Sequence, residues 1–196
     1  LVNGKHHILK RKKINYKVGV SLRYKNIFQF HPEYKGTKTL VIGSYSVKET
    51  KNILLMVADL EGMLFKGHPL IDNKIFSDHL NKTIIPTQIN IYDLFSQTAL
   101  IIGGASGSLA EGIACGVSIL VIANENELLT NPLAEVGKGK MWDIAYNKTD
   151  ILVKSAELLN YRNEHKDEIA EITSWYRRHF FVEPTKENIK QTFELN

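Results

Sequence analysis

The most constraining part of this sequence is residues 99–123, ALIIGGASGSLAEGIACGVSILVIA. Two continuous apolar runs, 100–102 and 117–123, flank a turn of small residues and a short helical pattern. Strands that are apolar along their whole length are typical of parallel sheets, because helices cover both faces of such sheets. The stretch therefore predicts a strand–helix–strand unit whose two strands lie parallel.

The same alternation continues on both sides of this unit. Ser46 and Glu49 have the spacing of a capping box at the start of a helix, and Gly62 is placed to end that helix. Repeated strands and helices with short connections predict an α/β fold: a Rossmann-like, doubly wound, mostly parallel sheet of five or six strands. The expected strands are 39–43, 63–65, 82–86, 99–102, 117–122 and 141–145, and the expected helices are 46–60, 91–97, 109–115, 150–159 and 165–178.

The pattern divides the chain of 196 residues into three parts. Residues 1–37 do not join the alternation, and we interpret them as a linker or edge segment with a strand at 16–24 that pairs with 27–30. Residues 38–180 form the Rossmann-like domain. Residues 181–196 form a C-terminal tail with some helical character.

Composition and charge narrow the classes of function. No apolar run reaches the roughly 18 residues that a membrane span needs. The single cysteine, Cys115, excludes a disulfide framework and fits a buried hydrophobe in a reducing, cytoplasmic compartment. Much of the net charge of +4 comes from the basic run 10–13. This run lacks the interleaved aromatic residues that stack on bases, so we expect no nucleic-acid partner, while peripheral contact with an anionic membrane surface stays open.

Polar groups follow three of the predicted strands, where doubly wound sheets bind their ligands. The three loops come after 39–43, after 63–65 and after 99–102. We expect them to meet at one edge of the sheet, because the carboxyl ends of parallel strands lie together. The candidate binding residues in these loops are Gly43, Tyr45, Lys66, His68, Pro69, Gly104, Ser106, Gly107, Ser108 and Glu111.

The turn 103–108 lacks three well-known motifs. No Gly-Lys-Ser/Thr closes it as in a P-loop, its glycines do not have the G-x-G-x-x-G spacing, and Ser108 stands where G-x-S-x-G ends in glycine. What remains is a helix N-terminus with Ser106 as the cap and Gly107 permitting close approach, which favours a bound anion. Glu111 can accept hydrogen bonds from the two vicinal hydroxyls of a ribose. The alternative is that Ser106 and Glu111 only cap and decorate a helix.

The segment 66–69, Lys-Gly-His-Pro, places an imidazole at a strand end. Pro69 fixes the local backbone, and His68 can donate to a phosphate oxygen or help a leaving phosphate carry charge. The simpler interpretation is a turn, as for His31–Pro32. The other histidines show no spacing typical of metal ligands, so we expect neither a metal nor a cofactor.

Taken with these motifs, residues 39–159 resemble the C-terminal, nucleotide-sugar-binding lobe of a GT-B glycosyltransferase. The residues that carry the resemblance are KGHP after one strand, SGSLAEGIACG after another and the Asn/Glu-rich loop that starts at 124. They are most similar to bacterial surface-polysaccharide enzymes with a His-Pro motif: sialyltransferases, Kdo transferases and CDP-glycerol glycerophosphotransferases. The resemblance implies that His68 and Ser106–Ser108 contact the donor phosphate and that Glu111 binds the ribose.

This resemblance implies an enzyme that transfers a sugar from a CMP-, CDP- or UDP-linked donor to a glycan or lipid-linked acceptor. The setting would be bacterial surface polysaccharide or lipopolysaccharide synthesis, with His68 as the catalytic group and no metal, since no D-x-D cluster is present. A GT-B enzyme has two lobes and this chain holds one, so we expect the N-terminal lobe of the same enzyme as a partner and this chain to be a fragment. The Gly107–Ser108 pair departs from the Ser-Ser pair of the cytidine-linked families, which leaves the base open.

Two alternatives remain at the level of the sequence. The turn with its following acid also resembles the non-hydrolysing UDP-N-acetylglucosamine 2-epimerases. A non-catalytic nucleotide-binding module would keep the same pocket without the chemistry.

Overall fold

A computed structural model describes residues 4–8, 15–79, 83–123 and 131–195 of the chain. Within them, six strands form one sheet in the order β3-β2-β1-β4-β5-β6, and every pairing is parallel. The α/β, Rossmann-like prediction is therefore confirmed. The strands are β1 (Lys38–Ile42), β2 (Leu64–Lys66), β3 (Thr83–Ile85), β4 (Thr98–Gly103), β5 (Ser118–Ile122) and β6 (Trp142–Ala145).

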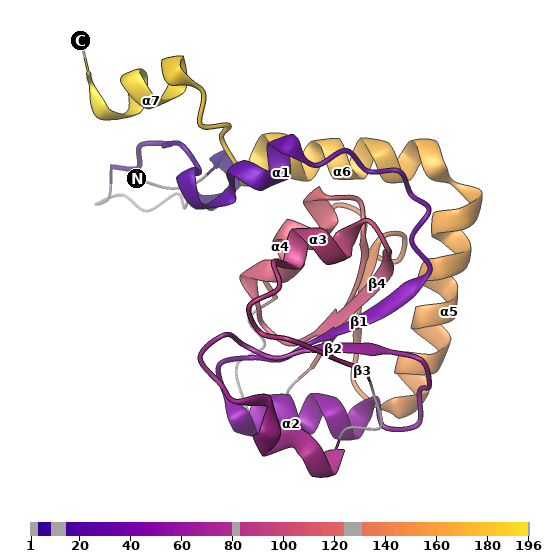
Figure 1. Cartoon of the computed structure of the whole chain (residues 1–196). Coiled ribbons are helices and arrows are strands. Elements are labelled where there is room, and N and C mark those ends of the chain that lie inside the picture. Colours follow the sequence, from indigo (N-terminus) through magenta and orange to yellow (C-terminus); the bar gives the residue numbers. More distant parts are fainter. Residues whose placement is uncertain (1–3, 9–14, 80–82, 124–130, 196) are drawn as a thin grey trace.

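Helices pack on both faces of this sheet (Figure 1). The described helices are α1 (Lys25–Gln29), α2 (Val47–Met56), α3 (Ile91–Phe95), α4 (Gly107–Ala114), α5 (Lys148–Glu164), α6 (Lys166–Phe180) and α7 (Lys186–Phe193), which lies away from the sheet, with short 3-10 helices η1 (Lys5–His7), η2 (Leu22–Tyr24) and η3 (Asn73–His79). Along β4, Leu100 and Ile102 join a buried cluster with α2, η3 and α5, whereas Ile101 joins the cluster with α1, α3, α4 and α6. Successive strand residues face opposite sides, so both faces of β4 are buried.

The segment before the sheet differs from its prediction. Residues 16–30 were expected to form paired strands, but they contain η2 and α1 instead. The reason is tertiary: Ser21 and Val182 exchange two hydrogen bonds of 2.9 Å, and Ile27 is fully buried. Figure 1 shows α1 running along α6. Contacts with residues far along the chain thus override the local alternation.

The start of α2 forms only half of the expected capping box. The Ser46 hydroxyl accepts from the Glu49 N–H at 3.3 Å, as predicted. The Glu49 carboxylate, however, accepts from the Ala105 N–H in the turn between β4 and α4, at 3.4 Å. The helix also ends at Met56, well before Gly62. The carboxylate therefore joins α2 to the turn before α4.

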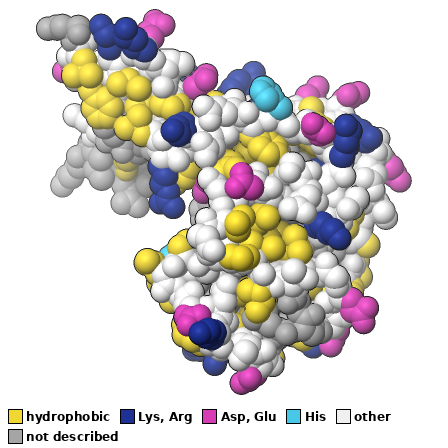
Figure 2. All heavy atoms as spheres, viewed as in Figure 1, with side chains coloured by type: hydrophobic (Ala, Val, Ile, Leu, Met, Phe, Trp, Pro, Cys, Tyr) yellow, Lys and Arg dark blue, Asp and Glu magenta, His cyan; other side chains and the backbone are white. Residues whose placement is uncertain are grey.

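Two predicted features lie outside the described residues: the basic run 10–13 and most of the Asn/Glu-rich loop, 124–130. In the described part of the chain, no helix is long and apolar enough to cross a membrane. Figure 2 shows exposed hydrophobic side chains in separate groups, with charged side chains between them.

Candidate functional site

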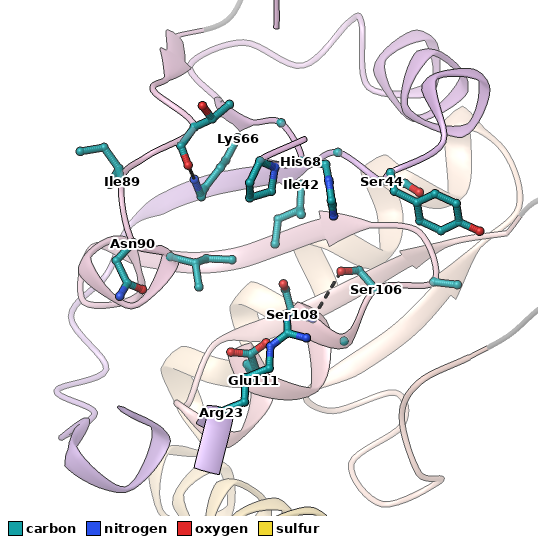
Figure 3. A pocket seen from close by; sticks show the side chains of 18 of the residues that line it. Arg23, Ile42, Ser44, Lys66, His68, Ile89, Asn90, Ser106, Ser108 and Glu111 are labelled. Carbon is teal, nitrogen blue, oxygen red and sulfur yellow. Dashed lines mark hydrogen bonds between the residues drawn. The ribbon is translucent and has the colours of Figure 1, made fainter. Parts of the chain in front are cut away.

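The carboxyl ends of β1, β2 and β4 open into one cavity of about 470 Å³. Its walls are the loops after these strands, the N-terminus of α4, residues 87–91 before α3, and Arg23 and Tyr24 of the N-terminal segment. In Figure 3, Lys66 and His68 lie on one side of the cavity. Ser106, Ser108, Glu111 and Arg23 lie on the opposite side. The three strand-end loops thus meet at one place.

The cavity brings together nine of the ten residues that the sequence singled out. These are Gly43, Tyr45, Lys66, His68, Pro69, Ser106, Gly107, Ser108 and Glu111. Gly104 does not line the cavity, because it faces α2: a Cβ at this position would lie 2.0 Å from Oε1 of Glu49. Gly104 thus lets the Glu49 carboxylate approach the turn. The binding roles of the lining residues stay predictions.

The N-terminus of α4 faces the cavity with open backbone. The Ser106 hydroxyl caps the helix by accepting from the Ser108 N–H at 3.3 Å. A Cβ at Gly107 would meet no atom within 4 Å, so the first helical residue borders open space. The first N–H groups of a helix lack partners within the helix, and together with the helix dipole they attract an anion. This wall is therefore suited to a phosphate.

His68 has one ring nitrogen occupied within its own loop. Its Nδ1 accepts a hydrogen bond from the Leu70 N–H at 3.2 Å. In the neutral imidazole this acceptor role places the proton on Nε2. The ring of Tyr45, which is 76% exposed, stands edge-on to His68 with 6.5 Å between the ring centroids. His68 can therefore donate from Nε2 to a group in the cavity.

Lys66 is a buried cation on the same side of the cavity as His68, with 6% of its surface exposed. Its ammonium donates to the Thr87 carbonyl at 2.9 Å. Burial lowers the pKa of this lysine below its ordinary value, because the charged form loses hydration. The ammonium still has two further N–H donors beyond the one that Thr87 accepts.

Glu111 lines the cavity although it is only 8% exposed. The Tyr92 hydroxyl donates to its Oε2, and Arg23 lies close enough to act on its charge. Burial raises the pKa of the Glu111 carboxyl, while the Tyr92 hydrogen bond and the Arg23 charge oppose that rise. Tyr92 occupies one carboxyl oxygen, which leaves the other for a ligand.

Sequence reasoning missed several residues of the cavity. The loop 87–91 follows β3, so the rule that identified the other three loops also applied to it. Arg23 and Tyr24 gave no such signal, because they lie before the first strand in a segment interpreted as a linker. Among the residues that the structure describes, no three His, Cys, Asp or Glu side chains group together as metal ligands.

The sequence matches no protein-family model and no curated protein. Solved structures do resemble its fold. The glycotransferase of kitacinnamycin aligns with a TM-score of 0.52 and 12% identity over 96% of this chain and 46% of its own. A variant of the wall teichoic acid polymerase TagF soaked with CDPG aligns with a TM-score of 0.50 and 14% identity over 89% and 45%. A UDP-GlcNAc 2-epimerase from Neisseria meningitidis aligns with a TM-score of 0.49 and 17% identity over 89% and 48%.

The first two of these alignments show the fold. It is an α/β, Rossmann-like fold, which this chain shares with both proteins. The chain spans less than half the length of each of the three proteins. The narrower resemblance to sialyl-, Kdo- or glycerophosphotransferases stays a prediction.

Proposed function

We propose that this chain binds the nucleotide of an activated sugar and acts as one lobe of a glycosyltransferase. The observation that carries the proposal is the convergence of strand-end loops and the open α4 N-terminus on one cavity. Two neighbours with TM-scores of 0.52 and 0.50 are named for transfer or polymer synthesis, one of them a glycotransferase and the other a wall teichoic acid polymerase. The first name supports transfer of a sugar, and the second supports a role in bacterial surface polysaccharide synthesis.

In this proposal different residues of the cavity bind the phosphate and the ribose of the donor. The N–H group of Gly107 and the dipole of α4 bind a phosphate, and the free oxygen of Glu111 accepts from a ribose hydroxyl. Residues 38–180 form the nucleotide-sugar-binding domain. The acceptor is a glycan or a lipid-linked molecule. The N-terminal lobe of the same enzyme binds it and carries the catalytic base.

His68 acts on the leaving group. When the bond between the anomeric carbon and the phosphate oxygen breaks, the bonding electrons stay on that oxygen and its negative charge grows. The Nε2–H of His68 donates to this charge, and the dipole of α4 stabilises it from the opposite wall. Donors held in place before the reaction stabilise a transition state without reorganisation.

Nucleotide titration of the chain tests the binding part of this proposal. We expect calorimetry to detect CMP, CDP or UDP. Gly107→Asp should abolish that binding, because its side chain enters open space and places a carboxylate where the phosphate sits. The variant should still fold, since a carboxylate in the first turn of a helix is stabilising. Gly107→Asn, of nearly the same size but neutral, is the matched control and should bind much more tightly than the aspartate. Equal affinities for the two variants would contradict a phosphate site at α4.

A His68→Asn variant of the complete two-lobed enzyme tests the catalytic part, because this lobe alone is expected to bind the nucleotide without turnover. The asparagine oxygen can still accept from Leu70, but no donor reaches the place of Nε2. We expect donor turnover to fall about 10²–10³-fold, the usual loss of one such donor, with little change in thermal unfolding. In the complete two-lobed enzyme, nucleotide binding without turnover would indicate a binding module, and interconversion of two UDP-sugars would indicate an epimerase.

A further inference from the structure

Arg23 reaches the cavity from outside the strand-and-helix units. It lies in η2, before β1, yet it lines the same cavity as His68 and the α4 N-terminus. Figure 3 shows its side chain extending from the ribbon toward Glu111. None of the sequence motifs that predicted the cavity includes Arg23.

The backbone around Arg23 is held firmly. Ser21 is 1% exposed, and its N–H donates to the Val182 carbonyl while its hydroxyl accepts from the Val182 N–H. The Tyr24 N–H donates to the Ser21 carbonyl at 2.9 Å, and the Tyr24 ring packs on Phe181 with 5.1 Å between centroids. These contacts fix the backbone from which the Arg23 side chain extends.

The charge of Arg23 acts on the nearby Glu111 but forms no direct polar contact in the described part of the chain. The other three described arginines each donate to a backbone carbonyl: Arg162 to Gly116, Arg177 to Ala114 and Phe30, and Arg178 to Ser174. Arg23 makes no ion pair or side-chain hydrogen bond with a described residue. Its guanidinium carbon stands only over the Tyr24 ring, 5.6 Å from the centroid.

Glu111 interacts with Arg23 through its charge alone and does not supply a direct contact. One of its oxygens is taken by Tyr92, and it forms no ion pair with Arg23. The α4 N-terminus can accept one phosphate, which would leave the guanidinium without an anion. A guanidinium presents paired N–H donors that fit the oxygens of a phosphate or a carboxylate. The wall thus has capacity for a second anionic group.

We infer that Arg23 binds a second anionic group of the donor, beyond the phosphate at α4. This assignment rests on the proposed function and narrows its substrate class. A second anionic group comes either from the second phosphate of a nucleoside diphosphate or from the carboxylate of a sugar acid linked to a nucleoside monophosphate. A donor with only one anionic group would leave Arg23 unused.

The test compares ligands with one and two anionic groups on the whole 196-residue chain. Dissociation constants for CMP, CDP and a CMP-linked sugar acid are measured by calorimetry for the parent, Arg23→Gln and the control Arg178→Gln. Arg178 also loses one charge but lies on α6, outside the lining of the cavity. We expect Arg23→Gln to weaken one of the two doubly anionic ligands about 10- to 100-fold, as for a hydrogen bond to a charged group, and to leave CMP within about threefold.

Each pattern of results has a definite meaning. Selective loss of CDP assigns the second phosphate to Arg23, and selective loss of the CMP-linked sugar acid assigns its carboxylate. Equal changes for all three ligands, or no change, would overturn the role of Arg23 while leaving the proposed function intact. If the parent bound none of CMP, CDP and UDP, the proposed function itself would be contradicted, and this assignment with it.

Discussion

Lys66 shows at the scale of one residue how binding competes with stability in this cavity. Its ammonium is buried and has a neutral carbonyl as its hydrogen-bond acceptor. Burying a charge without an opposite charge costs free energy. The pKa of Lys66 is lowered for the same reason. A phosphate entering the cavity would supply the missing negative charge, so this unfavourable burial fits a binding role.

Replacing Lys66 with methionine should separate the two effects. Lys66→Met keeps the length of the side chain and removes the charge, so we expect unchanged or greater stability at neutral pH together with weaker nucleotide binding. Because the folded-state pKa is lowered, the penalty in the parent is fully present below that pKa. It disappears as the pH rises through the ordinary lysine pKa of the unfolded chain. Urea unfolding of parent and variant across this range checks the expectation.

The stability difference between parent and Lys66→Met should therefore shrink as the pH rises. Taking the difference between the two proteins cancels the titration of every other group. Lys48→Met, at an exposed position of α2, is the control and should show no such trend. A pH-independent difference for Lys66→Met would contradict a lowered pKa.

At the scale of elements, the sheet was predictable and the N-terminal segment was not. The runs at β4 and β5 are apolar because helices cover both faces of these strands, and that signal is local. The alternation of apolar and polar residues at 16–24 did not predict the structure of that segment. Its fate as η2, followed by α1, depends on Val182 and Phe181, which are more than 150 residues away.

The same distinction applies to the cavity. Its strand-end residues were predictable because the topology of a parallel sheet brings carboxyl ends together. Arg23 of the lining and Tyr92, which holds Glu111, were not predictable, since the packing of separate segments brings each of them near Glu111. Gly104 was predicted to bind the ligand because it lies in the turn before α4. In the structure it instead leaves room for the Glu49 carboxylate and lies outside the cavity lining.

At the scale of the whole molecule, Arg177 ties three parts of the chain together. From α6, its Nε donates to the Ala114 carbonyl at 2.6 Å, at the end of α4. Its Nη2 donates to the Phe30 carbonyl at 2.8 Å, at the end of α1. One side chain thus anchors both the helix whose N-terminus faces the cavity and the segment that carries Arg23.

Arg177→Met should destabilise the whole molecule without changing its ligand preference. We expect the free energy of unfolding to fall by about 2–3 kcal/mol, because two carbonyls lose a charged donor while the apolar stem is kept. Arg178→Met, next along α6 and more exposed, should change it by no more than about 0.5 kcal/mol. The ratio of CDP to CMP affinity should stay that of the parent, since Arg177 is not part of the cavity lining. Equal stability of the two variants would show that the N-terminal segment and α4 are held in place by their apolar contacts alone.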